Sequence, residues 1–226
     1  ICDPWLLRSN GTRLDLLQLR DGALHEIAHH HLAEQIEPVR HVSAEYDDVV
    51  ADWIARFDFG IVHIRHLGFH SLNLPRVARE KGCMTVFSFH DFYMLCPSIK
   101  LLEGEVFYGG DLDRLTGVVT PELWTAEQMP PADAHWISHW RQRAGQALSG
   151  CDAFVTTSAS ARDSVLRHLP CIDPKRFHII PHGRDFPLMA RLRRPPRHSE
   201  AIRILVPGGI GVPKGLAVIR DLLTED

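Results

Sequence analysis

The fold is decided by residues 59–91, which read FGIVHIRHLGFHSLNLPRVAREKGCMTVFSFHD. A run of β-branched apolar residues predicts a buried strand over 59–64, and Ser71 can cap a helix that continues to the stop signal Lys81-Gly82. A second β-branched and aromatic run predicts a strand over 84–89. Strands of this kind, which lack strict polar alternation and are separated by a helix, are typical of a parallel sheet covered on both faces.

The same alternation continues on both sides of this unit. Upstream, Ser43 is a candidate N-cap for a helix that runs to about Arg56 with its apolar residues on one face. Downstream, the pattern predicts helices over 133–148 and 159–168 and strands over 153–157 and 177–180. Residues 13–19 predict a short strand, and 98–117 a loop region with a hairpin. We therefore expect an α/β fold, a Rossmann-like parallel sheet with helices on both faces.

The composition changes near the end of the chain. Residues 191–199 are basic and contain two prolines, which is typical of a linker. They are followed by a predicted strand over 202–206, a glycine-rich turn and an apolar helix to Leu223, the opening unit of a second doubly wound lobe. We expect a first lobe at 1–190, a linker at 191–200 and the start of a second, truncated lobe at 201–226.

Composition and charge exclude several function classes. The chain has 226 residues, is 45% hydrophobic and carries a formal net charge of −3, which gives no reason to expect a nucleic-acid partner. Its apolar runs are far shorter than the roughly 20 residues of a membrane span. The five cysteines are widely spaced without a Cys-x-x-Cys pair, which predicts reduced thiols in a cytoplasmic protein.

The 15 histidines raise the question of a metal site. His29, His30 and His31 are adjacent, and neighbouring residues on a strand or helix do not point the same way. The chain has no His-Glu-x-x-His motif. We therefore expect no metal.

Polar residues follow the predicted strands where a ligand site is expected. His90 and Asp91 follow the strand over 84–89, and His66 and His70 follow the strand over 59–64. Open α/β sheets bind ligands at the carboxyl ends of their strands. A neutral imidazole there can donate to a substrate oxygen or act as an acid or base, although a capping role is the alternative for each histidine.

Further candidates follow the later strands. Ser158 ends one strand and starts a helix, so it either leaves backbone N–H groups for a ligand or serves as a simple N-cap. His182 follows the strand over 177–180. The glycine-rich turn can cradle a diphosphate, with backbone N–H groups and one lysine supplying positive charge, through Gly208, Gly209, Gly211 and Lys214.

Taken together, these motifs resemble the GT-B glycosyltransferases, specifically the retaining family 4 group. The resemblance runs from about Asp47 onward, and its most specific element is His90-Asp91-Phe92-Tyr93-Met94-Leu95-Cys96-Pro97. Supporting elements are His66-Leu67-Gly68-Phe69-His70-Ser71, Trp140-Arg141, Cys151-Asp152-Ala153-Phe154-Val155-Thr156-Thr157-Ser158, Ile180-Pro181-His182-Gly183, and the stretch from Gly208 to Lys214-Gly215.

The resemblance implies a two-lobed enzyme that transfers a sugar from a nucleotide sugar to a glycan or lipid-linked acceptor. His90 matches the active-site histidine of the family, and His66, His70, Asp91, Ser158 and His182 are expected to bind substrate. Gly208, Gly209, Gly211 and Lys214 match the loop near the donor diphosphate, where cations and helix ends replace a metal. A cytoplasmic location follows, with peripheral association at the inner membrane for a lipid-linked acceptor.

Two departures from the family pattern limit this expectation. No strand, glycine-rich turn and helix precede Trp5, and the acidic motif of the donor lobe is absent. We therefore expect an acceptor-side piece of a larger enzyme that is inactive alone. Three alternatives remain, namely a non-catalytic Rossmann-like binding module, a metal-dependent hydrolase and a nucleotide-sugar epimerase.

Overall fold

The computed structural model describes residues 3–129, 132–181, 183 and 209–224. The chain divides into two compact units, Ile1–Pro181 and His182–Asp226. The linker expected at 191–200 and the strand expected at 202–206 lie outside the described residues.

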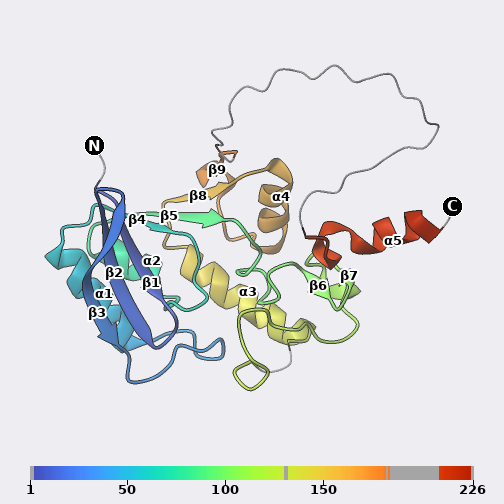
Figure 1. Cartoon of the computed structure of the whole chain (residues 1–226), viewed down its shortest axis with the longest axis horizontal. Coiled ribbons are helices and arrows are strands. Elements are labelled where there is room, and N and C mark those ends of the chain that lie inside the picture. Colours follow the sequence, from blue (N-terminus) through green and yellow to red (C-terminus); the bar gives the residue numbers. More distant parts are fainter. Residues whose placement is uncertain (1–2, 130–131, 182, 184–208, 225–226) are drawn as a thin grey trace, which may run out of the picture. The chain divides into compact units, whose positions relative to one another are not determined.

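Four parallel strands form the central sheet of the first unit, in the order β4-β5-β8-β9 (Figure 1). Ile64 lies opposite Phe87 in one pair, and Phe89 lies opposite Thr156 in the next. The strands are β4 Ile61–Ile64, β5 Met84–Phe89, β8 Ala153–Thr156 and β9 Phe177–Ile179. This sheet confirms the α/β fold expected from the sequence, with each strand within two residues of its expected bounds.

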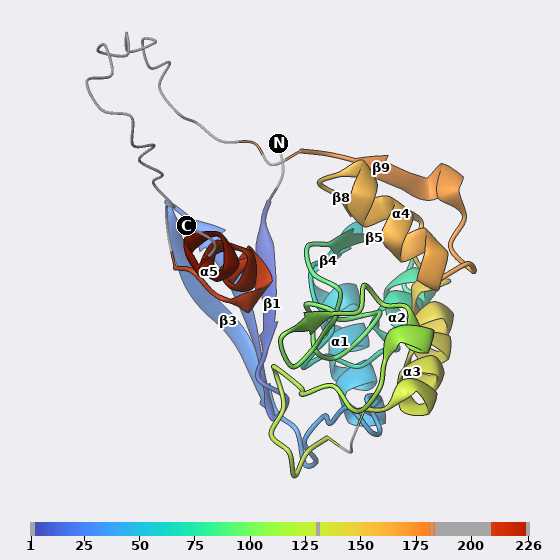
Figure 2. The same cartoon turned by 90° about the vertical axis from the view of Figure 1, so that its right-hand side faces the viewer.

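The helices of the first unit flank this sheet. α2 contacts β4 and β5, α4 contacts β8 and β9, and α2 also contacts α1 and α3. Figure 2 shows α1, α2 and α3 side by side on one side of the strands. The side chains of Ser43 and Ser158 cap α1 and α4, as their sequence positions predict, and Asp133 caps α3. The bounds are α1 Ala44–Arg56, α2 Leu74–Glu80, α3 Ala134–Leu148 and α4 Ala159–His168.

One helix begins later than the sequence predicts. α2 starts at Leu74, three residues after the expected cap Ser71. The hydroxyl of Ser71 accepts from the backbone N–H of Asn73, and its carbonyl accepts from the N–H of Leu74. Ser71 therefore closes a turn before the helix instead of capping it.

The expectation that β4 is a fully buried strand is wrong for half of its residues. Ile64 is 3% exposed, whereas Ile61 is 64% exposed. β4 pairs only with β5 among the described strands, and successive side chains of a strand point to opposite faces. Val62 and Ile64 therefore face the packed side, and Ile61 and His63 face the open side.

Aromatic side chains form the centre of the packed face. The rings of Phe89 and Phe177 stack with centroids 5.6 Å apart, and Phe154 lies 5.7 Å from Phe177. Burying one such side chain contributes about 1.5–3 kcal/mol. This packing keeps the ends of β5, β8 and β9 in fixed positions beside one another.

A separate antiparallel sheet precedes α1, and the sequence predicts only its middle strand. It consists of β1 Trp5–Ser9, β2 Arg13–Arg20 and β3 Ala23–His31. The sequence predicts 13–19 as a strand, whereas β1 is short and β3 carries mostly polar residues. Their strand conformation depends on pairing with β2, which no local pattern reveals.

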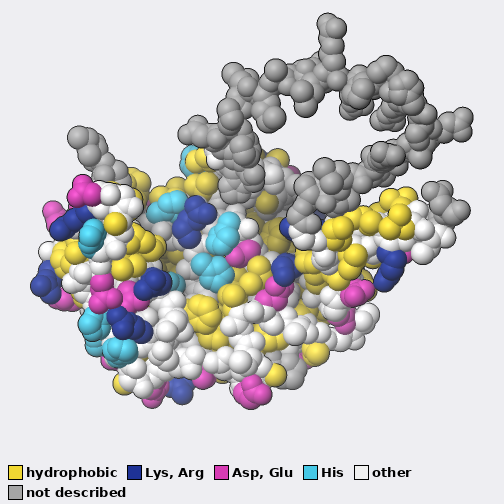
Figure 3. All heavy atoms as spheres, in the orientation of Figure 1, with side chains coloured by type: hydrophobic (Ala, Val, Ile, Leu, Met, Phe, Trp, Pro, Cys, Tyr) yellow, Lys and Arg dark blue, Asp and Glu magenta, His cyan; other side chains and the backbone are white. Residues whose placement is uncertain are grey.

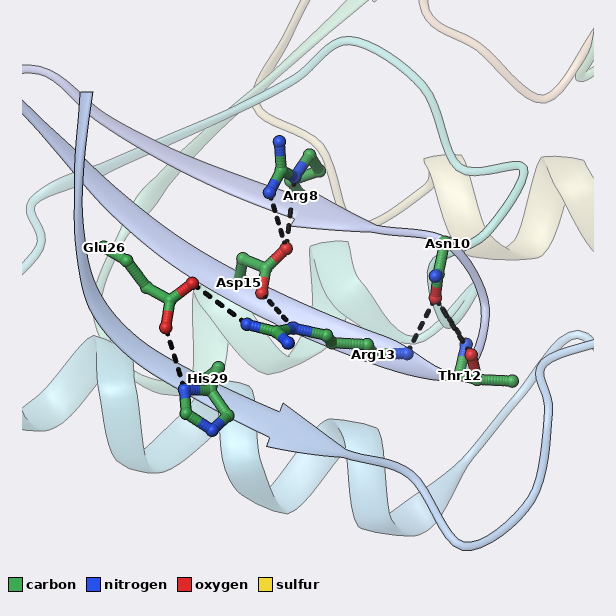
Figure 4. Close-up of polar contacts among 7 residues, drawn as sticks. All are labelled: Arg8, Asn10, Thr12, Arg13, Asp15, Glu26 and His29. Atoms are coloured by element: carbon green, nitrogen blue, oxygen red, sulfur yellow. Dashed lines mark hydrogen bonds and ion pairs between the residues drawn. The ribbon is translucent and has the colours of Figure 1, made fainter. Parts of the chain in front are cut away.

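Charged side chains form a network on this sheet (Figure 4). The buried carboxylate of Asp15 accepts from Arg8 at 2.9 Å and from Arg13 at 2.5 Å. Arg13 also donates to Glu26 at 3.0 Å, and Glu26 lies 2.9 Å from Nδ1 of His29. Pairing with two guanidinium groups compensates the burial of the Asp15 charge.

The loop region after β5 contains the predicted hairpin, formed by β6 Leu102–Glu103 and β7 Val106–Phe107. Arg141 of α3 donates to the carbonyls of Leu95 at 3.0 Å and Gly110 at 2.6 Å. Hydrogen bonds from one guanidinium group therefore hold the segments before and after the β6–β7 hairpin against α3. The described part of the first unit also contains short 3-10 helices at Leu112–Arg114 and Pro174–Arg176.

The described part of the second unit is a turn and a helix. A 3-10 turn at Val212–Lys214 leads through Gly215 into α5, Leu216–Thr224. Gly215 has a φ of 81°, which favours glycine. α5 confirms the helix expected to Leu223. Within the described residues, no helix combines the length and the apolar composition needed to cross a bilayer.

Candidate active site

Three predicted site residues meet at the carboxyl ends of β4 and β5. His66 lies two residues after β4, and His90 and Asp91 directly follow β5. The two strands are parallel neighbours, so the turns that follow them emerge at the same edge of the sheet. Figure 3 shows histidine side chains gathered near the end of β5.

The carboxylate of Asp91 lies between the two imidazoles. Its Oδ2 is 3.0 Å from Nε2 of His90 and 3.5 Å from Nε2 of His66. The two imidazole centroids are 5.8 Å apart. The Asp91 side chain is 19% exposed, and those of His66 and His90 are 26% and 37% exposed, so a ligand can reach all three. We call these three residues the His-Asp-His cluster.

Backbone and aromatic contacts hold the cluster in place. Oδ1 of Asp91 accepts from the backbone N–H of Tyr93 at 2.9 Å. The ring of Tyr93 lies against that of His66, with centroids 4.7 Å apart and 34° between the planes. Nδ1 of His66 accepts from the backbone N–H of Gly68 at 2.8 Å. Burial lowers the pKa of His66, against the opposing charge of Asp91, so its imidazole is neutral at pH 7.

Tyr93 is in turn anchored in the core. Its hydroxyl accepts from Nε1 of Trp124 at 3.2 Å and lies 2.9 Å from Nε2 of His41. Its carbonyl accepts from Nε1 of Trp140 at 2.9 Å. His41 is fully buried, and burial lowers its pKa to about 3. Tyr93 and its partners are not predicted as part of the site from the sequence, although two aromatic residues, Phe92 and Tyr93, directly follow His90-Asp91.

His70 has a different polar partner from His90. Its Nδ1 is 2.7 Å from the hydroxyl of Tyr46 on α1, and burial lowers its pKa to about 4. His66 and His70 both line a cavity of about 200 Å³ along β4, whose other walls include apolar residues of β1 and α1. His66 therefore lines the same cavity as His70, and it lies beside the same carboxylate, that of Asp91, as His90.

Ser158 stands at the same edge of the sheet, after β8. Its Oγ accepts from the backbone N–H of Ala161 at 3.1 Å, so its hydroxyl serves as the N-cap of α4. His182 and Gly208 lie outside the described residues.

The remaining predicted residues belong to the second unit. Gly211 precedes the 3-10 turn, and the backbone N–H of Lys214 donates to its carbonyl at 2.8 Å. Gly209 and the side chain of Lys214 are exposed. An exposed ammonium group beside a glycine-rich turn can attract an anion.

A metal site is a separate question for a chain with many histidines. Within 3–129, 132–181, 183 and 209–224, no three His, Cys, Asp or Glu side chains are grouped in a way that could hold a metal ion.

Two comparisons relate the chain to known proteins. A family model described as Glycosyltransferase Family 4 matches residues 7–186. A stretch of 62 residues, 27% of this chain, is 37% identical to part of the protein named Alpha-maltose-1-phosphate synthase from Mycolicibacterium smegmatis (strain ATCC 700084 / mc(2)155). That stretch spans 15% of the length of this relative.

Proposed function

Because the chain belongs to glycosyltransferase family 4, we propose that it serves in the transfer of a sugar from a nucleotide sugar to a glycan or lipid-linked acceptor. The first unit is the acceptor-side lobe in this proposal, and the second unit begins the lobe that binds the nucleotide sugar. The observation that carries the proposal is the His-Asp-His cluster, which joins two imidazoles and one carboxylate at the carboxyl ends of β4 and β5. Such a group offers hydrogen bonds to a sugar ring.

The proposed reaction breaks the bond between the anomeric carbon and the diphosphate and forms a bond to an acceptor hydroxyl, with retention of configuration. The proton of the acceptor hydroxyl passes to an oxygen of the nucleoside diphosphate, which leaves with the bonding electrons. His90 is assigned to the reacting sugar, because it is the most exposed member of the cluster. His66, His70, Asp91, Ser158 and His182 are assigned to the sugar and the acceptor.

The leaving diphosphate needs positive charge. We assign this role to Lys214 and to the turn formed by Gly208, Gly209 and Gly211, without a metal ion. The exposed Lys214 side chain and the glycine at the start of the 3-10 turn support this assignment. The proposal places the protein in the cytoplasm, with peripheral contact to the inner membrane when the acceptor is lipid-linked.

The test measures release of nucleoside diphosphate from a panel of nucleotide sugars with glycan and lipid-linked acceptors. The assay uses the longest protein that contains this chain, because the family relative is much longer than the matched stretch. We expect His90→Ala to lower turnover about 100-fold or more. The matched control is His135→Ala, which alters an exposed histidine on α3 and leaves turnover unchanged.

Other outcomes identify the alternatives. Saturable binding of nucleotide sugars without product would favour a non-catalytic binding module. Interconversion of the nucleotide sugar without transfer would favour an epimerase. Stoichiometric zinc or manganese in the purified protein would favour a metal-dependent hydrolase.

A further inference from the structure

The contact between Gly68 and His66 is closer than any side chain would allow. A Cβ atom added to Gly68 would lie 2.6 Å from Cε1 and 2.8 Å from Nδ1 of His66. It would also lie 2.9 Å from Cδ1 of Leu123, the far end of a flexible side chain. Gly68 does not have a positive φ, so its backbone conformation is open to other residues. Glycine is required here for the close approach of the imidazole.

This contact determines which nitrogen of His66 carries the proton. The backbone N–H of Gly68 donates to Nδ1 at 2.8 Å, so Nδ1 must present its lone pair. Burial lowers the pKa of His66, which favours the neutral ring. A neutral imidazole with an acceptor at Nδ1 carries its proton on Nε2. The ring of Tyr93, which packs against that of His66, restricts rotation that would exchange the two nitrogens.

The resulting N–H group lies near the carboxylate of Asp91. Nε2 of His66 is 3.5 Å from Oδ2 of Asp91, beyond the usual length of an N–H···O hydrogen bond. The N–H of His66 and the Asp91 oxygen therefore both keep capacity for a ligand. They form a donor and an acceptor side by side on the partly exposed surface of the site.

A hydroxyl group matches this pair, because it accepts one hydrogen bond and donates another. The diphosphate of a nucleotide sugar carries no proton at neutral pH, so it only accepts hydrogen bonds, and the Asp91 carboxylate repels it. We propose that Gly68 is a positioning residue that holds His66 as an Nε2–H donor beside Asp91, and that this pair binds a hydroxyl of the sugar rather than its phosphate. This inference rests on the proposed glycosyl transfer.

The first test determines the tautomer of His66 by ¹⁵N NMR of the imidazole nitrogens at neutral pH. We expect Nε2–H in the unaltered chain and a mixture of tautomers in Gly68→Ala. The matched control is Gly60→Ala, since a Cβ at Gly60 meets no atom within 4 Å and its φ is not positive. The control keeps the Nε2–H tautomer.

Two results would overturn the positioning role. The first is an Nδ1–H tautomer in the unaltered chain, a measurement that needs no variant to fold. The second is a Gly68→Ala protein that stays folded by circular dichroism and retains the Nε2–H signal unchanged.

The second test separates hydroxyl from phosphate recognition. The unaltered chain is titrated with methyl glycosides of glucose, mannose, galactose and rhamnose, and separately with dimethyl phosphate, a monoanion that carries no proton, while the His66 Nε2 signal is followed. We expect at least one glycoside to shift the signal saturably, with at least tenfold weaker binding in Gly68→Ala, and no saturable shift with dimethyl phosphate. A response to dimethyl phosphate alone, or to no glycoside, would overturn the ligand assignment. Neither readout depends on turnover, so this inference and the proposed transfer can fail separately.

Discussion

Two histidines with strongly lowered pKa values make the stability of the first unit sensitive to mild acid. The perturbation is a change from pH 7.5 to pH 5.5. Burial lowers the pKa of His41 to about 3 and that of His70 to about 4. His41 is fully buried, whereas His70 is partly buried. Both stay neutral in the folded protein across this change.

The unfolded chain behaves differently. A histidine in an unfolded chain has a pKa of about 6.5, so it takes up a proton below that pH. The free energy of unfolding therefore falls as the pH drops from 6.5 toward the folded pKa, by about 1.4 kcal/mol per unit for each histidine. At pH 5.5 we expect a loss of about 1.4 kcal/mol from His41 and at most the same from His70. Carboxylates with lowered pKa, such as Asp152, lose their contribution only in stronger acid.

The assay is guanidinium denaturation at both pH values, followed by tryptophan fluorescence. Trp140 and Trp124 are suitable probes, since their rings lie 5.3 Å and 6.4 Å from that of His41. His70→Gln should remove up to half of the pH-dependent loss, because Gln does not titrate. His25→Gln, on the exposed side of β3, is the control for the substitution itself. A total loss below about 0.5 kcal/mol between the two pH values would refute the reasoning.

Three further substitutions test contacts that support the site. Tyr93→Phe leaves two buried ring nitrogens without their hydroxyl partner, so the free energy of unfolding should fall by about 2–4 kcal/mol in chemical denaturation. Asp152→Asn weakens the hydrogen bonds from the backbone N–H and hydroxyl of Thr85, at 2.7 Å and 2.9 Å, and should cost about 1–2 kcal/mol at pH 7. Because these bonds lower the pKa of Asp152, its contribution is lost as the pH falls below about 4, and that acid-dependent part should disappear from the variant's pH–stability curve. Arg141→Lys cannot satisfy both carbonyls that the guanidinium group holds, so hydrogen exchange should accelerate in the β6–β7 hairpin with little change elsewhere. Unchanged stability in the first two variants, or unchanged exchange in the third, would contradict these contacts.

Much of the fold could be predicted because its signals are local. Ser43 and Ser158 cap helices by bonding to residues three positions ahead, which the sequence displays directly. The β-branched and aromatic runs of the parallel strands are equally visible. The antiparallel sheet was predicted only in part, because β1 and β3 are stabilised by pairing with β2 rather than by their own composition.

The candidate site also has features that local sequence patterns predict and features that only the packing of the folded chain decides. The sequence by itself determined that His66, His90 and Asp91 follow neighbouring strands, because the carboxyl ends of parallel strands share one edge of a sheet. Only the tertiary structure decided that His70 turns to Tyr46, and that the N–H of Gly68 and the ring of Tyr93 hold the His66 imidazole. Side-chain direction and tautomer depend on these packing and hydrogen-bond partners. Tyr46 and Tyr93 lie far in sequence from the histidines that they contact, and Gly68, although two residues from His66, meets its ring only through the conformation of the turn in the folded chain. The order of the strands therefore brings the groups together, and the packing around them determines what each group can bind.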